Sequence, residues 1–579
     1  MKKRFLVLLA ACLFSALIAL GGCTPPTEKP GDGGDDEFGL ATTIDTNRTT
    51  LFVSNFNGGF GERWLKAAAK RYEELHKEDI YEEGKKGVQV WIDNSKTVGS
   101  NQLANIDSSR DAIFFTEYVY ASDYAASGKV LDLSDIIKDP LTEYGEARSI
   151  TDKMTLEQQD YFIQEDGSCY VLPHYQSFRG IMYDVDLFEQ ELFYFAADRN
   201  NGNDGFITSL SDTRSAGPDG ESGSYDDGLP ATYEEFFKLC DRMIEFGVKP
   251  VIWSGSNQAY FTDFLAALAL DYEGLNDAML NFTFKGTAYN LVESVNSDGS
   301  LTLMNDGDVD GAGVAVSPNN GYLLTKQAGK YYSLLFAEQL LQSKYIASGS
   351  MGTLSHTDAQ KNFINSRPSS TEQTIGMIIE GTFWENECAD MNYFEVAERT
   401  YGSKFSRENR RFAFMPYPKA TEEELGGVTL TDSLMSGAFI RGNVTGVEKD
   451  LALDFLQFLY TDESLREFTK YTGSPKAMNY DIDGVEGLSY FTQSVFAMKE
   501  RADIVYPYSS SALFSAYPSA FQPTSFYSTV VNQGQGNVPY TYPSRAIFDS
   551  HVTAKQYFEG LSVAQTKSSW ENSYSNYFE

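Results

Sequence analysis

A strand followed by a helix is predicted by residues 50–76, TLFVSNFNGGFGERWLKAAAKRYEELH. The apolar run 50–54 opens the segment, and a glycine-containing turn separates it from a helix expected over Glu62–His76. Apolar side chains recur in that helix at spacings of three and four and form one face: Leu65, Ala68, Tyr72 and Leu75. Further strands are expected at 88–92 and 112–115. Because helical segments separate these strands, they predict a parallel sheet whose ligands bind beyond the carboxyl ends of the strands.

A second set of strands and helices follows. Strands are expected at Val171–Pro173, Ile181–Tyr183 and Val248–Trp253, and a helix is expected over Thr232–Phe246 with Thr232 as its cap. Two consecutive amphipathic helices are expected near the end of the chain, and these need a lobe to pack on. They are predicted over Lys449–Tyr460 and from Thr461 to Gly473.

The first residues predict export. Lys2, Lys3 and Arg4 precede an apolar run that is too short to cross a bilayer and ends in Leu-Gly-Gly-Cys at residues 20–23. This tetrapeptide resembles the bacterial lipobox, which implies removal of residues 1–22 as a lipoprotein signal peptide and acylation of Cys23. Residues 23–45 begin with a polar stretch rich in proline and glycine and are expected to act as a flexible tether. The expected location is therefore the extracytoplasmic face of the cell membrane, with the lipid anchor as the only membrane contact.

Composition narrows the function further. The net charge of −35 argues against nucleic-acid binding, which requires clustered Lys and Arg. Aromatic residues make up 14% of the chain, which suits a protein that stacks on apolar ring faces. Besides Cys23, the mature chain would keep only Cys169, Cys240 and Cys388, too few and too widely spaced for a disulfide scaffold. Buried free thiols are expected, with one disulfide among the three as the alternative.

Seven segments, in this order, resemble the extracellular solute-binding proteins of carbohydrate ABC transporters, the family 1 type that includes maltose-binding protein. They include FNGGFGERW at 56–64 and IGMIIEGTFWENE at 375–387. The other five are residues 111–137, 169–190, 229–243, 410–419 and 434–477.

The resemblance implies a two-lobed α/β fold of the type II periplasmic-binding-protein kind. Each lobe would hold a mainly parallel sheet flanked by helices, and hinge crossings would join the lobes near 170–175, 414–418 and 490–505. Lobe 1 would then comprise 46–170 and 418–490, and lobe 2 would comprise 175–414 and 495–579. The resemblance also implies a binding protein, expected to be a monomer, that delivers an oligosaccharide to ABC permease subunits, needs no cofactor and catalyses no reaction.

Sugars need aromatic platforms and a rim of polar groups. The resemblance places an aromatic residue at Trp384, which makes it the first candidate, beside Phe383 and Glu385. Trp253 and Tyr260 flank a polar loop after a strand and are candidates on the same grounds. The polar rim is expected at strand ends and at the first crossing, although such residues are also common as turn formers and helix caps: Asn55, Asn57, Asp93, Asn94, Thr116, Glu117, Tyr175 and Arg179.

The polar insertion 198–228 is a separate candidate. Its oxygen side chains lie on glycine-rich turns, which suits a structural calcium ion. The expected ligands are Asp198, Asn200, Asp204 and Asp219, but the spacing does not match an EF-hand loop, and a solvated loop is the alternative.

Two other function classes remain open. An extracytoplasmic glycoside-acting enzyme would need a pair of carboxylates, which 81 acidic residues readily supply. However, the chain contains no HExxH, GxSxG, Walker or CxxC motif. A surface adhesin lipoprotein would need neither a cleft nor lobe crossings.

Overall fold

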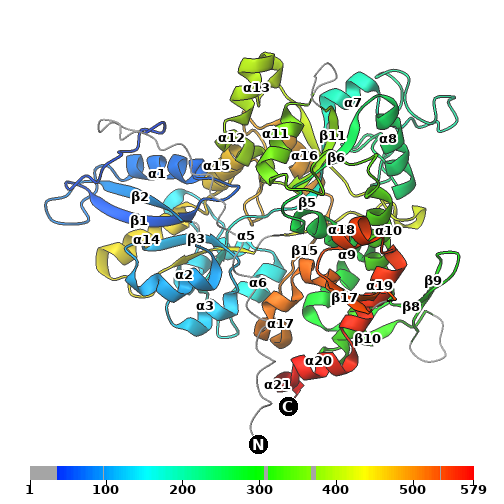
Figure 1. Ribbon diagram of the computed structural model, residues 1–579. Helices are drawn as coiled ribbons and strands as arrows, with labels where there is room; N and C mark the ends of the chain where they lie inside the picture. Colours follow the sequence, from blue (N-terminus) through cyan, green and yellow to red (C-terminus); the bar gives the residue numbers. More distant parts are fainter. Residues whose placement is uncertain are drawn as a thin grey trace, which may run out of the picture.

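The computed structural model describes residues 36–578, except for 96, 306–310, 367–372, 434 and 535. The predicted leader, Cys23 and most of the tether lie outside the described residues. Figure 1 shows two α/β lobes side by side, lobe 1 on the left and lobe 2 on the right. Each lobe combines segments that are far apart in the chain, so the lobes are discontinuous in sequence.

Lobe 1 is built on a five-stranded sheet of order β2-β1-β3-β14-β4. β1 pairs in parallel with β2 and β3, as the opening segment predicts, whereas β14 runs antiparallel to β3 and β4. The strands are β1 (Thr49–Phe56), β2 (Val88–Ser95), β3 (Ile113–Glu117), β4 (Leu172–Pro173) and β14 (Ser436–Ile440).

Helices cover both faces of this sheet because their apolar stripes need burial. The helix predicted over Glu62–His76 forms as α1 (Arg63–Leu75), with Leu65, Ala68 and Tyr72 buried. The predicted helix pair also forms, with Thr461 as the side-chain cap of the second helix and Gly473 in the left-handed conformation after it. The remaining helices of lobe 1, together with this pair, are α2 (Gly99–Asn105), α3 (Ala121–Ser127), α4 (Ser134–Lys138), α5 (Ile150–Lys153), α6 (Leu156–Phe162), α14 (Gly446–Phe458) and α15 (Asp462–Thr472).

Lobe 2 has a four-stranded sheet of order β12-β5-β11-β6. β11 pairs in parallel with β6, but β5 runs antiparallel to both of its neighbours. Each main sheet is therefore mainly parallel, as predicted, with one reversed strand: β14 in lobe 1 and β5 in lobe 2, each of which directly follows a lobe crossing. The strands are β5 (Arg179–Asp184), β6 (Lys249–Ile252), β11 (Ile375–Gly381) and β12 (Phe412–Met415).

The buried helical segment α9 (Ala259–Thr283), which is kinked at Gly274 where φ is +68°, lies against this sheet and carries much of the rest of lobe 2. Thr232 caps α8 by accepting a hydrogen bond from the backbone N–H of Glu235, as predicted. The C-terminal segment packs on α9 and α10 (Figure 1). The other helices of lobe 2 are α7 (Val185–Glu191), α8 (Tyr233–Glu245), α10 (Ala328–Leu340), α11 (His356–Ile364), α12 (Trp384–Asp390), α13 (Tyr393–Tyr401), α16 (Tyr490–Lys499), α17 (Ala512–Ala516), α18 (Pro543–Ser550), α19 (Ala554–Ala564), α20 (Lys567–Ser573) and α21 (Ser575–Phe578).

Small two-stranded sheets and 3-10 turns complete the molecule. The sheets pair β7 (Gly286–Ala288) with β10 (Val314–Val316), β8 (Val292–Val295) with β9 (Leu301–Leu303), β13 (Thr429–Thr431) with β15 (Asp503–Val505), and β16 (Thr529–Asn532) with β17 (Asn537–Tyr540). The 3-10 turns are η1 (Ile106–Ser108), η2 (Thr142–Tyr144), η3 (Pro318–Lys326), η4 (Ser403–Phe405), η5 (Glu422–Glu424), η6 (Pro518–Phe521) and η7 (Pro523–Tyr527).

The chain crosses between the lobes three times. The first crossing joins β4 to β5, close to the predicted position. The second joins β13 to β14 and so lies later than the predicted 414–418, because Lys419 is buried in lobe 2 with its Nζ 2.7 Å from the Asp271 carboxylate. The third ends before α16, earlier than the predicted 490–505, because Ser494 in α16 accepts a hydrogen bond from the backbone N–H of Phe414 in lobe 2.

Cys169, Cys240 and Cys388 are buried free thiols, which confirms the prediction of free cysteines over that of one disulfide. Within the part of the chain that the structure describes, no helix combines the length and apolar character that a membrane crossing requires.

Candidate functional site

Arg179 lies where the first crossing enters lobe 2, at the start of β5. Its guanidinium carbon is 4.6 Å from the ring centre of Tyr260 and 5.0 Å from that of Phe383. Tyr260 comes from the first turn of α9, and Phe383 follows the end of β11. Three separate segments of lobe 2 therefore place one buried cation between two aromatic rings, an arrangement worth about 0.5–2 kcal/mol for each ring.

Two carboxylates face this guanidinium without closing on it. Nε of Arg179 lies 3.6 Å from Asp263, and Nη1 lies 3.8 Å from Glu380. These separations are too long for hydrogen bonds. Among the described residues, neither buried nitrogen has a hydrogen-bond acceptor. Since buried donors normally find acceptors, these two N–H groups are available to a polar ligand.

Burial is the main cause of unusual pKa values in both carboxyl groups. It raises the pKa of Glu380 to about 8 and that of Asp263 to about 6, although Arg179 acts in the opposite direction on each. Glu380 is therefore mostly protonated at neutral pH and can donate a hydrogen bond as well as accept one. Its oxygens accept from Gln360 Nε2 at 3.2 Å and from the backbone N–H of Gly381 at 2.9 Å.

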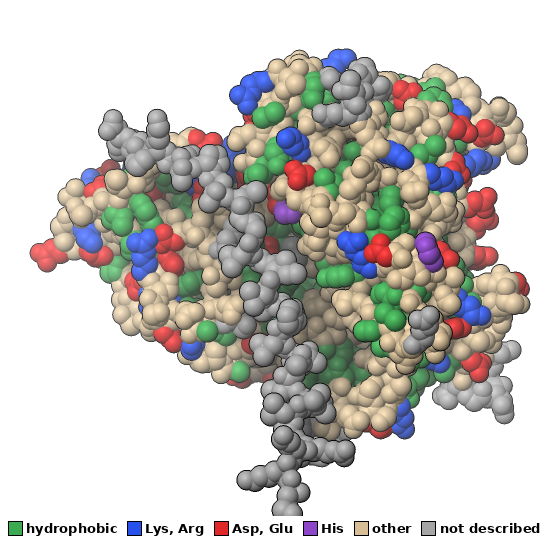
Figure 2. Space-filling view, in the orientation of Figure 1, with side chains coloured by type: hydrophobic (Ala, Val, Ile, Leu, Met, Phe, Trp, Pro, Cys, Tyr) green, Lys and Arg blue, Asp and Glu red, His purple; other side chains and the backbone are tan. Residues whose placement is uncertain are grey.

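Lobe 1 contributes Tyr118 to the same place. Tyr118 follows β3, is 48% exposed and has a φ of +57°, a conformation that is rare for a bulky residue. Burial of its hydroxyl raises its pKa to about 12, with the charges of Glu117 and Asp263 acting in the same direction and Arg179 in the opposite one. Tyr118 thus lies within electrostatic range of groups from both lobes. Figure 2 shows charged side chains of both signs scattered over the visible face of both lobes. We call Tyr118, Arg179, Tyr260, Asp263, Glu380 and Phe383 the Arg179 site.

A glycine of lobe 1 allows the lobes to approach each other beside this site. A Cβ on Gly59 would lie 2.6 Å from the Phe383 ring of lobe 2. Asn386 Nδ2 donates to the carbonyl oxygen of Gly59 at 3.0 Å. The FNGGFGERW segment therefore forms a direct contact between the lobes.

Trp384 and Trp253 were predicted as stacking platforms, and the structure corrects both. Trp384 is fully buried and packs edge-on against Phe412 and Phe491 of lobe 2, at ring-centre distances of 5.1 Å and 5.6 Å. Trp253 is also fully buried and stacks on Phe261 at 4.9 Å. Phe383, the candidate directly before Trp384, lies beside Arg179 instead, because α12 begins at Trp384 and turns the tryptophan into the core.

The other predicted residues divide between the junction and structural roles. Glu117 accepts a hydrogen bond from the hydroxyl of Tyr175 at the lobe junction. Asn55 donates to the backbone of Gly61, and Asn94 donates to Glu62, so both hold the turn before α1. The backbone N–H of Asn57 extends the β1–β2 ladder by donating to Ser95.

Two predicted carboxylates are engaged in ion pairs. Asp93 binds Arg110 with both of its oxygens, at 2.7 Å and 2.9 Å. Glu385 is buried and pairs with Arg407 at 3.0 Å. These partners give both carboxylates a structural role. Thr116 is buried and donates weakly to the carbonyl of Thr97 at 3.4 Å.

Tyr118, Asp263 and Glu380 were not predicted. Glu380 lies near the end of the predicted strand in the segment 375–387, and Tyr118 directly follows the predicted Glu117. Their positions at strand ends could therefore have marked both as candidates. Asp263 offered none, because only the packing of α9 on the sheet brings it to Arg179.

Two of the predicted calcium ligands in the insertion have partners within the protein. Asp219 pairs with Arg501 at 2.7 Å, and Asp198 accepts a hydrogen bond from the backbone N–H of Asn200 at 2.9 Å. Asp204 sits in a left-handed turn with a φ of +51°. In the described ranges, no three His, Cys, Asp or Glu side chains gather where they could hold a metal ion.

The fold and the site together define a two-lobed protein with a polar and aromatic site at the lobe junction. Residues 59–335 match the family model described as "Bacterial extracellular solute-binding protein". Over these residues the chain is therefore similar to the bacterial extracellular solute-binding proteins. No curated protein sequence matches it.

Solved structures share the fold at low sequence identity. A chitin oligosaccharide binding protein is 14% identical, with a TM-score of 0.51 over 90% of this chain and 98% of that one. A probable secreted solute-binding lipoprotein from Streptomyces coelicolor is 13% identical, with a TM-score of 0.51 over 90% and 99%. The GacH receptor of Streptomyces glaucescens, solved without ligand and with acarbose, is 11% identical, with a TM-score of 0.51 over 89% and 97%.

Proposed function

We propose that this solute-binding protein captures an oligosaccharide at the Arg179 site and delivers it to the permease of an ABC importer. The observation that carries the proposal is the buried guanidinium of Arg179. It lies beside the rings of Tyr260 and Phe383, and its Nε and Nη1 have no hydrogen-bond acceptor among the described residues. A sugar offers hydroxyl oxygens for such donors and apolar C–H faces for such rings. The matched structures that bind a chitin oligosaccharide or acarbose support this class of ligand.

The two-lobed arrangement supplies the mechanism. Tyr118 belongs to lobe 1, whereas Arg179, Tyr260 and Glu380 belong to lobe 2, so a ligand that contacts both sets favours the closed arrangement. The hinge segments run side by side, with the Ser433 N–H donating to the Ser177 carbonyl at 2.6 Å. Closure would present both lobes together to the permease.

We further propose that Cys23 anchors the protein by lipid to the extracytoplasmic face of the membrane and that the protein acts as a monomer without catalysing a reaction. Mass spectrometry of the membrane fraction tests the anchor: it should show an N-terminal acylated Cys23, and a Cys23→Ser variant should be released from the membrane. A Cys23→Ser variant that stays in the membrane fraction would contradict this assignment.

A panel of neutral oligosaccharides tests the ligand class. Isothermal titration should show binding of at least one member, and Arg179→Met should weaken that binding about tenfold or more, because hydrogen bonds to a charged donor are lost. Arg110→Met is the control, since Arg110 is exposed, pairs with Asp93 on the edge strand β2 and lies over Phe52 in lobe 1, outside the Arg179 site. Chromatography of the titrated sugars separates the alternatives: intact sugars fit a receptor, whereas cleaved sugars would establish a glycoside-acting enzyme.

A further inference from the structure

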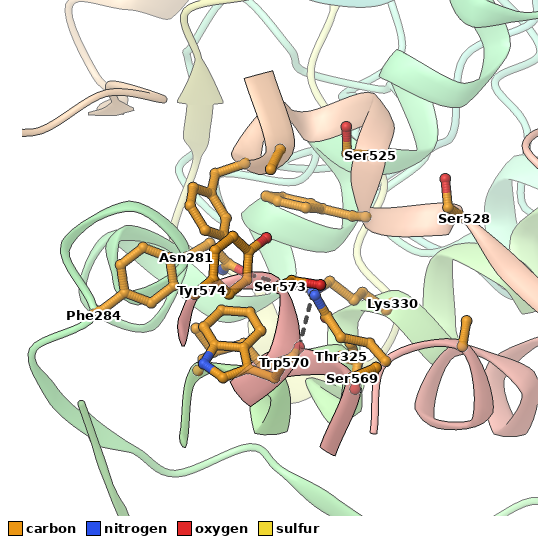
Figure 3. Close-up of a pocket in the computed structure, with 17 residues that line it drawn as sticks. Asn281, Phe284, Thr325, Lys330, Ser525, Ser528, Ser569, Trp570, Ser573 and Tyr574 are labelled. Carbon is orange, nitrogen blue, oxygen red and sulfur yellow. Dashed lines mark hydrogen bonds between the residues drawn. The ribbon is translucent and has the colours of Figure 1, made fainter. Parts of the chain in front are cut away.

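A cavity of about 240 Å³ lies within lobe 2 and shares no residue with the Arg179 site. Its walls come from the end of α9, from η3 and α10, and from the C-terminal elements η6, η7 and α20. Figure 3 shows the side chains that line it. The cavity therefore sits where the last part of the chain docks on the lobe.

One wall of the cavity is a cluster of four aromatic rings, Phe284, Phe521, Trp570 and Tyr574. Trp570 and Tyr574 have ring centres 4.7 Å apart, and Phe284 and Phe521 are also separated by 4.7 Å. Trp570 is fixed, because its Nε1 donates to the carbonyl oxygen of Pro318 at 2.8 Å. The ring cluster is thus a rigid apolar surface.

Gly321 shows how closely this wall is built. A Cβ on Gly321 would lie 2.6 Å from Cζ2 of Trp570 and 2.9 Å from the Phe284 ring. Only glycine lets the backbone of η3 meet the indole at this distance.

The opposite side of the cavity holds the amine of Lys330, which is only 3% exposed. Its Nζ donates to the carbonyl oxygen of Leu324 at 2.8 Å and to Asn281 Oδ1 at 3.3 Å. An ammonium group has three donors, so one makes no hydrogen bond; the amine also lies 4.5 Å from the ring centre of Phe526, which lines the cavity as well. Figure 3 shows the amine directed inward, toward the side of Ser573 and Tyr574.

Lys330 also lacks a direct counter-charge. No ion pair joins it to a carboxylate within the described residues, and burial lowers its pKa to about 7, with only the more distant charge of Glu273 acting in the opposite direction. A buried ammonium without an adjacent anion is costly, and an anionic ligand would remove that cost.

The hydroxyl groups of the lining are less available. Ser569 Oγ donates to the Thr566 carbonyl at 2.9 Å, and Thr325 Oγ1 donates to the Tyr322 carbonyl at 2.8 Å. Ser525 donates to the Ser519 carbonyl at 3.4 Å. Ser528, Gln565 and Ser573 add further polar groups to the lining, but the charged residue among those that line the cavity is Lys330.

We propose that this cavity binds a small carboxylate with an aromatic ring, its carboxylate on Lys330 and its ring against the Phe284, Phe521, Trp570 and Tyr574 cluster. The volume is below that of sites for drug-sized ligands, which restricts the ligand to a small molecule. Such a ligand would connect α10 to α20 and so hold the C-terminal helices on lobe 2.

The test compares indole-3-acetate with its neutral isostere indole-3-acetamide, together with benzoate and phenylacetate, by isothermal titration of the full-length protein. At least one carboxylate should bind, and indole-3-acetate should bind about tenfold or more tightly than the amide, because only the acid satisfies the ammonium. Equal binding of acid and amide, or no binding of any carboxylate, would overturn the proposal without requiring a variant.

Variants and hydrogen exchange locate the binding. Lys330→Met should remove the preference for the acid, whereas the control Lys344→Met should keep it, since Lys344 is an exposed lysine paired with Asp241. Bound acid should slow amide exchange in residues 318–330 and 567–574 but not in 375–383. Preference for the acid that survives in Lys330→Met, or protection confined to 375–383, would overturn the assignment to this cavity.

Discussion

Glu380→Gln should stabilise the protein at alkaline pH and leave it nearly unchanged at mildly acidic pH. Burial raises the pKa of Glu380 from its ordinary 4.5 to about 8, so the folded state retains a proton that the unfolded state releases above pH 4.5. The wild-type protein therefore loses stability as pH rises from 4.5 toward 8. The amide does not titrate and escapes this loss.

The magnitude follows from the two pKa values. At about 1.4 kcal/mol per pH unit, ionisation of Glu380 costs roughly 4 kcal/mol at pH 8 and roughly 1 kcal/mol at pH 5. Both carboxyl oxygens accept hydrogen bonds, from Gln360 and Gly381, so the amide replaces one acceptor with a donor and loses about 1 kcal/mol. The variant should be about 3 kcal/mol more stable than the wild type at pH 8 and equal to it within about 1 kcal/mol at pH 5.

Urea unfolding followed by circular dichroism at pH 5 and pH 8 measures both differences. Glu395→Gln is the control, because Glu395 is exposed on α13, and it should shift neither value. A difference between Glu380→Gln and wild type that is the same at both pH values would refute the raised pKa. It would also remove the conclusion that Glu380 is protonated at neutral pH and can donate a hydrogen bond.

Three further substitutions distinguish binding residues from core residues. In calorimetric titration, Tyr118→Ala should weaken sugar binding by about 2 kcal/mol, with folding nearly unchanged. The control Tyr289→Ala removes another exposed tyrosine, outside the site, and should have no effect. Equal affinities of Tyr118→Ala and the wild type would exclude Tyr118 from the site. Trp384→Ala should instead lower the free energy of unfolding by about 3–5 kcal/mol, because the indole is fully buried; an intact unfolding midpoint would show that the core model is wrong. Lys419→Met should destabilise the protein in urea by about 3–5 kcal/mol, because Asp271 would stay buried without its partner, and a loss below 1 kcal/mol would contradict this.

The local elements followed directly from the sequence. The helix at α1, the helix pair α14 and α15, and the cap of α8 at Thr232 all lie within a few residues of their predicted bounds. Periodicity and caps are properties of neighbouring residues, so they can be recognised along the chain without knowledge of the fold.

Membership of the binding site was harder to predict. Phe383 and Trp384 are adjacent aromatic residues after the same strand, yet one lies beside Arg179 and the other in the core. The start of α12 at Trp384 decides which ring faces which way. The pairing of Asp93 with Arg110 and of Glu385 with Arg407 could not be read from the sequence either.

The sequence by itself determined the alternation of strands and helices, the strongly acidic character and the export signal expected for residues 1–22, because each depends on composition or on residues a few positions apart. Only the tertiary structure decided that Arg179 meets Tyr260, Asp263 and Glu380, and that Lys330 faces Trp570 across a cavity. These contacts join segments far apart in the chain, and their geometry depends on how α9 and the C-terminal helices pack. The direction in which a side chain points into such packing is a long-range property, which local patterns do not encode.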